Sequence, residues 1–540
     1  MRLRSARWLG VGLLCGGLLG VGLAGCAVGP DYRVPKIAVP GAYRAAVAGG
    51  ADAASATGTV TGAGAGGSAA AGANGVGYRE AVSPDIELNQ WWRALNDAEL
   101  NSLIDRATRA NPDVEIALTR LQEVRTQEAA HVSAALPTVA GSAAGGRGTG
   151  SDLSLAGAPP ALREADSKGD LSQIREVAGF SASWELDLFG GYRRAIEAGK
   201  YDVGAAAAAR NAVLVSMIAD VARHYVDLRG LQARLVILRA NIAAAAQSRD
   251  LEQVRFDRGL TNELDLQLAN RELSTLRAQE PLVVSGISAT QGDIAVLLGV
   301  YPEDLAAELA KPERFPDLPE HVASGLPLDL LRRRPDIRES ERQLAAATAR
   351  IGVATASLFP HLTLSGGLGT QAGSVGLQGS HIWAFGPSVY WPLLDFGALD
   401  AQVSNAHLQA HEQLVAYKKT IVGAVRDADN SMANFSAQIQ RLDALSQARV
   451  ASERAVSLAQ QRYDRGLTDF LNVVDAQHQQ FSLEDEYTAA RQSAADAFIS
   501  LCQALGGGWE NYQSVPAIRR PEPAVIAGFH RLATRGGTEN

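Results

Sequence analysis

The chain has 540 residues and a formal net charge of −8 at pH 7. This mildly acidic balance gives no electrostatic footprint for a nucleic-acid partner. Only three cysteines are present, which excludes a disulfide-stapled scaffold. Stability must therefore come from packing and assembly.

The N-terminus predicts a processing signal at residues 1–25. Arg2, Arg4 and Arg7 precede an apolar stretch that runs through Ala24, which is the order of a secretory signal peptide. The alternative is a membrane-spanning anchor, because the apolar stretch is nearly long enough to cross a bilayer.

The end of this signal predicts a lipid anchor. Leu23-Ala24-Gly25-Cys26 resembles the lipobox of bacterial lipoproteins, in which the cysteine becomes the acylated first residue. Ala27 stands where an Asp would retain the protein in the inner membrane, so we expect a lipidated segment at 26–45 anchored in outer-membrane lipid. Several acyl chains on Cys26 would anchor stably. We expect no cofactor besides this covalent lipid. Once Cys26 is acylated, Cys502 has no intrachain partner.

Residues 46–80 are rich in Gly and Ala, and their composition cannot bury a core. We predict that this insertion is flexible.

An internal duplication organises the rest of the chain. The pairs that define it are Asn111-Pro112-Asp113 with Arg334-Pro335-Asp336, Trp184 to Gly190 with Trp391 to Gly397, and Phe256-Asp-Arg-Gly259 with Tyr463-Asp-Arg-Gly466. The first pair is offset by 223 residues and the other two by 207. We therefore predict a first repeat at 81–299, an equatorial linker at 300–325, a second repeat at 326–507, and an equatorial segment with a loose tail at 508–540.

The sequence of each repeat predicts, in order, a short helix, two strands, a long helix, a tight turn and a returning helix. The long helix of the second repeat has apolar residues at alternating steps of four and three, which is the seam of a coiled coil. These residues are Ile421, Val425, Ala428, Met432, Phe435, Ile439 and Leu442. The corresponding residues of the first repeat are Leu214, Ile218, Val221, Tyr225, Leu228, Gln232 and Leu235. The interval from Gly190 to Arg258 predicts about 100 Å of helix.

The turns between long and returning helices have a local mechanism. Gly259 and Gly466 suit the left-handed position that ends a helix. Thr261 and Thr468 are then expected as N-caps of the returning helices. A helical hairpin without a functional tip is an equally simple interpretation of this pattern.

Alternating residues predict the strands. Phe180 to Leu188 and His361 to Ser365 alternate, and the segment Trp383 to Trp391 has aromatic residues near both ends. Such strands suit an outer-membrane barrel, although a soluble hairpin is the alternative. Four strands per chain are too few to close a barrel, so several chains are required, and three would give twelve strands. We expect no later transmembrane helix.

Longer motifs resemble one family. Cys26 to Pro35, Trp91 to Leu100 and Gly325 to Asp336 are similar to the outer-membrane factor lipoproteins, the NodT-type and OprM-like relatives of TolC. The resemblance implies an α+β membrane protein: a homotrimer whose twelve-stranded β-barrel continues into a periplasmic α-helical coiled-coil barrel. It implies a passive export duct in the outer membrane of a Gram-negative bacterium. Its partners would be a periplasmic adaptor and an inner-membrane pump of the resistance-nodulation-division class.

The resemblance also implies two kinds of site. The turns that would dock onto the adaptor are Arg258, Gly259, Leu260 and Thr261, and Arg465, Gly466, Leu467 and Thr468. The periplasmic gate would be formed by Leu471 and Asp475, with Arg462 and Tyr463 holding the closed state. A spacing of four places Leu471 and Asp475 on one helix face, and three converging carboxylates would favour cations. The alternative for Asp475 is a solvated surface acid.

Three rival functions remain. An enzyme is disfavoured, because Asp395-Phe396-Gly397 spells a kinase triplet without the phosphate loop or catalytic loop that a kinase needs. No metal-ligand motif occurs in the sequence either, so we expect no metal. A structural coiled-coil lipoprotein would explain the lipid and the helices but not the strands. A type I secretion duct for proteins stays open, because a passive duct does not choose its cargo.

Overall fold

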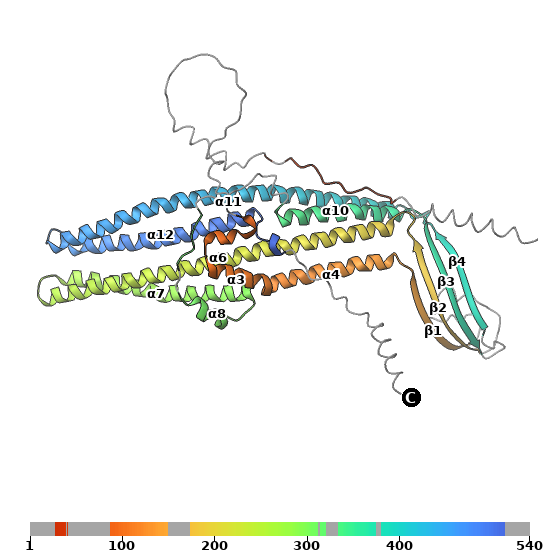
Figure 1. Cartoon of the computed structure of the whole chain (residues 1–540), viewed down its shortest axis with the longest axis horizontal. Helices are drawn as coiled ribbons and strands as arrows, with labels where there is room; N and C mark the ends of the chain where they lie inside the picture. The colour runs from red at the N-terminus through yellow and green to blue at the C-terminus, as the bar shows by residue number, and fades with distance from the viewer. Residues whose placement is uncertain are drawn as a thin grey trace, which may run out of the picture.

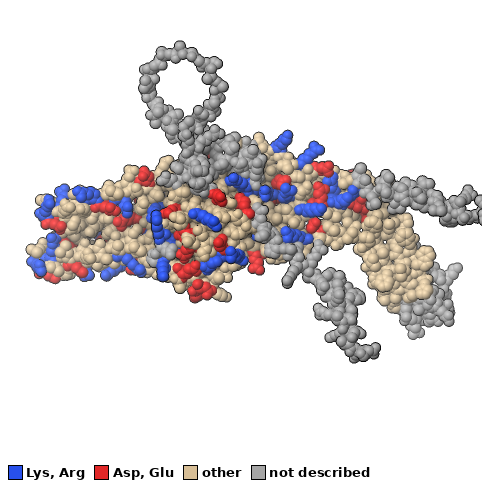
Figure 2. All heavy atoms as spheres, in the orientation of Figure 1, with Lys and Arg blue, Asp and Glu red and all other residues tan. Residues whose placement is uncertain are grey.

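The computed structural model describes residues 27–38, 40, 87–148, 173–311, 314–319, 333–373 and 380–512. The predicted signal peptide, Cys26, the insertion at 46–80 and the tail from residue 513 lie outside these residues. The molecule is elongated, with two helical hairpin tips at one end and a single sheet at the other (Figure 1). Charged side chains of both signs cover the helices, whereas the sheet shows none on the face drawn in Figure 2.

The two halves of the chain have the same order of elements, as the sequence predicts. The first half contains α4 (Pro112–Ala134), β1 (Thr138–Gly148), β2 (Gln173–Leu186), α6 (Gly191–Asp257) and α7 (Glu263–Leu298). The second contains α10 (Pro335–Ala356), β3 (His361–Gly373), β4 (Ser380–Tyr390), α11 (Ala398–Asp464) and α12 (Phe470–Ala504). Both long helices, α6 and α11, have 67 residues, which corresponds to about 100 Å.

Four shorter elements complete the described chain: η1 (Leu88–Leu95), α3 (Ala98–Ala110), α8 (Pro302–Leu309) and η2 (Glu510–Tyr512). The helix α8 lies in the segment predicted as a linker, and its Leu305 and Leu309 are fully buried. Tyr301 and Pro302 start this helix: Pro at the first helical position fits a helix N-terminus because its missing N–H would be unpaired there anyway.

The helices form one curved layer. α6 packs against α4 and α7 on one side and against α10 and α12 on the other, and α11 packs on α10 and α12. The layer therefore has two edges: one is formed by α4 and α7, and the other by α11 (Figure 1).

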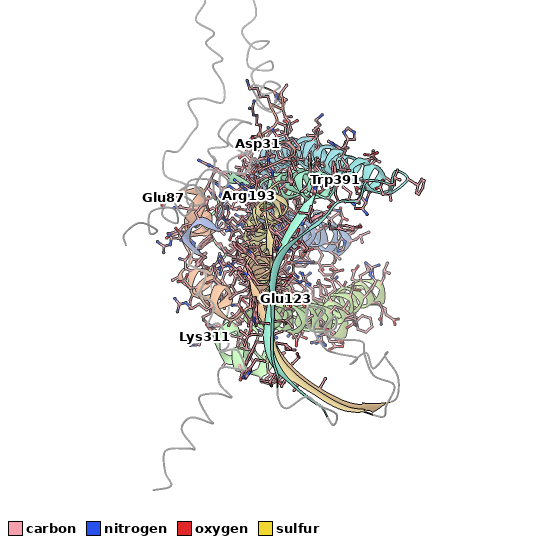
Figure 3. All side chains as sticks on the ribbon, turned by 90° about the vertical axis from the view of Figure 1, so that its right-hand side faces the viewer. Asp31, Glu87, Glu123, Arg193, Lys311 and Trp391 are labelled. Carbon is pink, nitrogen blue, oxygen red and sulfur yellow. The ribbon has the colours of Figure 1, made fainter. Side chains whose placement is uncertain are left out.

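The sheet has the strand order β1-β2-β3-β4, and all three pairings are antiparallel. The registers of β1–β2 and β3–β4 are equivalent: Thr138 opposes Ser183, and His361 opposes Tyr390, which are the same positions in the two repeats. Viewed along the long axis from the sheet end, the sheet bends as a curved wall (Figure 3).

The main core lies at mid-length, where η1 and α3 cover the long helices. Its largest fully buried side chains include Trp91, Tyr225 and Phe498. The predicted seams face this core, because Leu214, Ile218, Val221 and Leu228 are fully buried and Met432 and Phe435 nearly so. The heptad prediction is confirmed for these residues.

Two expectations are wrong. The N-caps of the returning helices are Asn262 and Asp469 rather than Thr261 and Thr468. The Asn262 side chain accepts the Asp265 N–H at 3.0 Å, while the Thr261 hydroxyl donates to the Asp265 carboxylate at 2.6 Å.

The sequence analysis expects no later transmembrane helix, and two helices of the structure bear on that expectation. By length and composition, α6 and α7 each contain a stretch apolar enough to cross a membrane. In α6 that stretch is 56% buried inside the chain, as for a helix at the centre of a packed layer. Its apolar composition therefore serves the core.

Candidate functional site

The sheet has two chemically different faces. Because directly opposed residues of an antiparallel sheet point to the same side, the registers sort the side chains into two sets. One face carries Val139, Gly141, Ala143, Ala178, Phe180, Ala182, Trp184, Leu186, Leu362, Leu364, Gly366, Leu368, Thr370, His381, Trp383, Phe385, Pro387 and Val389. The other carries Thr138, Ala140, Ser142, Gly179, Ser181, Ser183, Glu185, His361, Thr363, Ser365, Gly367, Gly369, Ile382, Ala384, Gly386, Ser388 and Tyr390.

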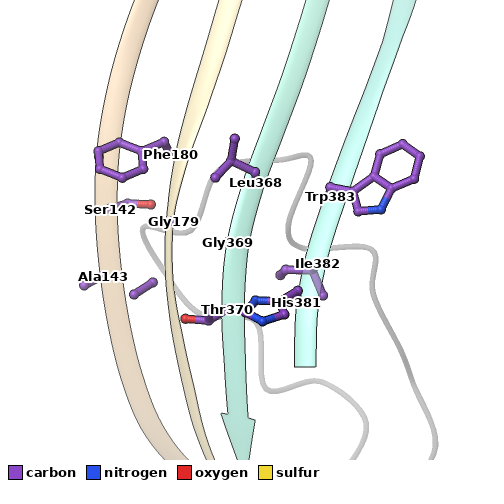
Figure 4. Close-up of a pocket in the computed structure, with 12 residues that line it drawn as sticks. Ser142, Ala143, Gly179, Phe180, Leu368, Gly369, Thr370, His381, Ile382 and Trp383 are labelled. Carbon is purple, nitrogen blue, oxygen red and sulfur yellow. The ribbon is translucent and has the colours of Figure 1, made fainter. Parts of the chain in front are cut away.

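The first set forms a large apolar surface that no element of the described part of the chain covers. Phe180, Leu368 and Trp383 form one continuous row across β2, β3 and β4, and Trp383 is 80% exposed. Phe385 beside this row is 77% exposed. A shallow hollow of about 680 Å³ follows the row and is lined mainly by apolar atoms (Figure 4). An exposed apolar surface of this kind marks a protein or membrane contact.

The second face is made of small and polar residues. Serine, threonine and glycine dominate it, so it offers hydroxyl groups to water and leaves space in front of the sheet. The contrast between the faces is the alternation of a membrane β-barrel wall, whose outer face meets lipid and whose inner face meets water.

The two helical tips have identical backbone geometry. Gly259 and Gly466 are left-handed, with φ of 72° and 68°, as predicted. Leu260 N–H donates to Arg255 C=O at 2.9 Å and Gly259 N–H donates to Phe256 C=O at 2.9 Å, which together make a Schellman motif. The second tip repeats both bonds one repeat later, from Leu467 and Gly466.

Most predicted tip side chains are exposed. Arg258, Leu260, Arg465 and Leu467 project into solvent, and Leu260 and Leu467 are 71% and 64% exposed. The positions Thr261 and Thr468 are partly buried. The tips therefore present a leucine and an arginine side by side at the far end of each hairpin.

One ion-pair network joins the two hairpins just above the tips. Glu252 of α6 has no solvent exposure, and its Oε1 accepts a hydrogen bond from the Tyr463 hydroxyl of α11 at 2.9 Å. Arg255 lies 3.5 Å from the same carboxylate and stacks over the Tyr463 ring at 4.6 Å. Burial, and then the neighbouring Glu252 carboxylate, raise the pKa of Tyr463 to about 12, so the hydroxyl keeps its proton and remains a donor.

The predicted gate residues are only partly brought together. Tyr463 belongs to the buried network, whereas Arg462, Leu471 and Asp475 are exposed in a single chain. Leu471 and Asp475 lie on α12, one turn apart. Sequence analysis did not identify Glu252, although the repeats carry a signal: the corresponding residue of the second repeat is Ala459.

A second unpredicted site holds the N-terminal segment. The buried guanidinium of Arg194 donates to the carbonyl oxygens of Val28 and Gly29 at 3.1 and 3.2 Å and to Asp31 at 2.7 Å. Tyr32 donates to Glu341 of α10 at 2.7 Å. We call residues 27–38 the strap, because they run beside α6 and α10 toward the root of the sheet (Figure 1).

Gly29 allows the strap to lie in direct backbone contact with α10. Its φ is +89°, and a Cβ there would lie 2.4 Å from Gly352 Cα. Only glycines at both positions allow the strap to approach α10 this closely.

Comparison with known proteins agrees with this geometry. The family model described as outer membrane efflux protein matches residues 103–300 and 326–507, which is most of both repeats. The fold and the two-faced sheet therefore define an outer-membrane efflux channel component, and the chain belongs to the outer membrane efflux protein family.

Individual relatives cover nearly the whole chain. It is 29% identical over 444 residues to nodulation protein T of Rhizobium leguminosarum bv. viciae, covering 82% of this chain and 88% of that protein. It is 32% identical over 425 residues to the solvent efflux pump outer membrane protein SrpC of Pseudomonas putida, covering 78% and 87% respectively. The resemblance seen in the sequence motifs is confirmed.

Solved structures show the same fold. The outer-membrane channel OprN superposes with a TM-score of 0.76 and 31% identity, covering 90% of this chain and all of that one. The open state of the Neisseria gonorrhoeae MtrE outer membrane channel superposes with a TM-score of 0.69 and 26% identity, covering 91% and 100%.

Proposed function

We propose that this protein is the passive outer-membrane duct of a tripartite efflux system. The observation that carries the proposal is the sheet with one apolar and one polar face, joined to two helical hairpins of about 100 Å. The apolar face would contact lipid and the polar face would line an aqueous lumen. The efflux outer-membrane proteins among its relatives support an export role.

The duct would be a homotrimer. Strands β1 and β4 are the edges of the sheet, and open edges are not tolerated in lipid because their N–H and C=O groups would be unpaired. Three copies would supply twelve strands, enough to enclose a lumen. The free helical edge supports self-association: on α11, Leu408, Val415 and Val422 are exposed at intervals of seven residues.

The helical hairpins would extend the duct through the periplasm. The tip residues 258–261 and 465–468 would dock onto a periplasmic adaptor. Leu471 and Asp475, repeated three times, would narrow the lumen at the tip. The Tyr463–Glu252 hydrogen bond would hold the two hairpins of each copy in the closed arrangement.

The lipid anchor would sit at the membrane level of the molecule. The strap places Ala27, the residue after Cys26, against Gly190 at the junction of the sheet and α6. Acyl chains on Cys26 would therefore enter the outer membrane beside the barrel wall. No further cofactor is required.

The cargo would be small molecules delivered by an inner-membrane pump of the resistance-nodulation-division class. Several relatives are named as toluene or solvent efflux proteins, which favours this cargo over secreted proteins. Energy and substrate choice would lie in the pump, since the duct has no reaction of its own.

Cysteine labelling in intact cells tests which face of the sheet meets water. Ser181 and Ala182 are consecutive residues of β2 that point to opposite faces of the sheet. A Ser181→Cys variant should react with a water-soluble, membrane-impermeant thiol reagent, and Ala182→Cys should not. Equal labelling of both variants would show that the apolar face is in water, and the duct proposal would fail.

A further inference from the structure

At the junction between sheet and helices, an aromatic side chain is packed against a partner in the first repeat and exposed in the second. In the first repeat, the Phe189 ring stacks on Phe359 with centroids 4.6 Å apart and planes at 17°. Phe396 holds the equivalent position in the second repeat and is 98% exposed. Its neighbours Leu393 and Leu394 are 71% and 85% exposed.

The rest of the junction is equivalent in the two repeats. The Trp184 indole donates to Ala135 C=O at 3.1 Å, and the Trp391 indole donates to Leu358 C=O at the same distance. These donors are 207 residues apart and the acceptors 223 residues apart, which are the offsets of the duplication. The tryptophan contacts are therefore repeated at both junctions, whereas the aromatic stack is present only at the first.

The missing partner can be identified from the same offsets. Phe359, the partner of Phe189, corresponds to Leu136 in the first repeat. Leu136 is 58% exposed and lies two residues after the end of α4, at the opposite edge of the layer from α11. One chain cannot bring its two edges together, whereas the Leu136 of a second copy can meet Phe396.

The strand register gives the same answer independently. The pairing of β1 with β2 maps onto that of β3 with β4 when each strand is shifted by its own offset. The same shift maps the pairing of β2 with β3 onto a pairing of β4 with β1 of another copy. In this pairing Tyr390 opposes Ser142, and Val389 opposes Ala143. Each pair lies on one face of the sheet, Tyr390 with Ser142 on the polar face and Val389 with Ala143 on the apolar face, so the two-faced pattern continues across the boundary.

We propose that the boundary between neighbouring copies, which we call the seam, repeats the boundary between the two repeats of one chain, which we call the internal boundary, with different side chains. At the seam, Phe396 packs on Leu136 of the next copy, and Tyr390 lies opposite its Ser142. This inference rests on the proposed trimeric duct and specifies its seam. One ion pair of the internal boundary has an uncharged counterpart at the seam. The Arg350–Asp202 ion pair at 2.6 Å joins α10 to α6, and the equivalent residues are Gln127 and Gln409.

Two further residues that contact the strap at the internal boundary have no such role at the seam. Tyr201, which contacts the strap through Tyr32 at 5.9 Å between ring centroids, corresponds to the exposed Leu408. Arg194, which holds the strap, corresponds to Ala401. The seam thus replaces a strap, an ion pair and an aromatic stack with apolar and amide side chains.

Disulfide trapping in the full-length lipidated protein tests this register. In an antiparallel pair, opposed Cα atoms lie about 4.5–5.5 Å apart, within disulfide range. The variant Tyr390→Cys/Ser142→Cys should give at least tenfold more covalent dimer and trimer on non-reducing gels than either single variant. The matched control is Tyr390→Cys/Ala143→Cys, whose second thiol would lie on the other face. Phe396→Cys/Leu136→Cys tests the junction contact separately.

The outcomes separate the seam from the duct. Cross-linking in the first and third double variants but not in the control supports the seam. Cross-linking in the control variant instead overturns the seam. Absence of cross-linking in every double variant also overturns the seam. In either case the duct proposal stands, provided that trimers form and Ser181→Cys and Ala182→Cys still label differently. Absence of trimers in the unmodified protein, together with equal labelling of Ser181→Cys and Ala182→Cys, overturns the seam and the duct together.

Discussion

Glu252 is a carboxylate with no solvent exposure that depends on two neighbours. Its Oε1 is held by Tyr463 and Arg255, and its Oε2 has no hydrogen-bond partner within the described residues. Removing a donor from a buried charged group typically costs about 1–3 kcal/mol. The contact joins α6 to α11, so it determines how tightly the hairpins close near their tips.

We expect Tyr463→Phe to loosen this end of the molecule. Hydrogen–deuterium exchange of peptides covering residues 248–260 should be faster than in the unmodified protein. Tyr487→Phe is a matched control, because Tyr487 contacts Arg449 through its ring, which phenylalanine keeps. Equal exchange in the tip peptides of both variants would show that the hydroxyl contact does not hold the hairpins.

Asp496 gives the folded protein a pH dependence. Burial, followed by the nearby Asp227 carboxylate, raises the pKa of Asp496 to about 7, and Arg223 partly opposes this. The ordinary pKa of an aspartate is about 3.9. The folded state therefore keeps a proton that the unfolded state has released, so the free energy of unfolding falls as pH rises from about 4 to about 7.

We expect Asp496→Asn to remove this slope. The variant should melt at a higher temperature than the unmodified protein at pH 8, and the difference should shrink at pH 5. A gain of about 1–3 kcal/mol is reasonable, since one pKa unit corresponds to about 1.4 kcal/mol and the site is partly solvated. Thermal melts of the detergent-solubilised protein at both pH values measure it, and identical slopes would contradict the assignment.

Single residues differed in how far the sequence revealed them. Gly259 and Gly466 were predictable because only a left-handed position explains glycine at a hairpin turn. The N-caps were misplaced by one residue because Thr, Asn and Asp are all competent caps, and the sequence does not show at which of two neighbouring residues the helix begins. Glu252 and Arg194 were missed because their partners lie on other elements.

At the scale of elements, the strap is held by a few polar contacts rather than by its own secondary structure. Arg194 binds two of its carbonyl groups and Asp31, and the Val28 N–H donates to Phe189 C=O at 3.0 Å. The residues directly after Cys26, the proposed acylation site, are therefore fixed to the root of the sheet.

We expect Arg194→Gln to release the strap. Trypsin should then cut after Arg33 and Lys36 several times faster in the membrane-bound protein. The proposed incorporation of fatty acid at Cys26 should be unchanged, since Arg194 binds Val28, Gly29 and Asp31 rather than Cys26. Arg193→Gln is the control, because Arg193 pairs with Asp187 outside the strap. Equal cleavage of the Arg194→Gln and Arg193→Gln variants would show that Arg194 does not hold the strap in place.

Long periodic elements were the most predictable. The bounds of α6 and α11 follow from the interval between Gly190 and Arg258 and from the seam, because a heptad pattern this long has few alternatives. The helix α8 was not predicted, since its Pro-rich surroundings favour a linker and its burial depends on distant partners.

At the scale of the whole molecule, a single chain is visibly incomplete. Among the residues that the structure describes, the sheet has two open edges, no element covers its apolar face, and Phe396 projects into solvent. The sequence could predict that several chains are needed from the count of strands alone. It could not place the seam, because that depends on registers and exposures that only the folded chain defines.

The central claim is that three copies form a duct whose narrowest point lies at the second tip. Single-channel conductance in planar bilayers tests it most directly, with the unmodified protein compared with Asp475→Ala and Leu471→Ala. We predict a small, cation-preferring conductance that rises in both variants, because each removes a group that narrows the lumen. No conductance from a well-folded trimer in any variant would contradict the duct and favour a structural envelope lipoprotein.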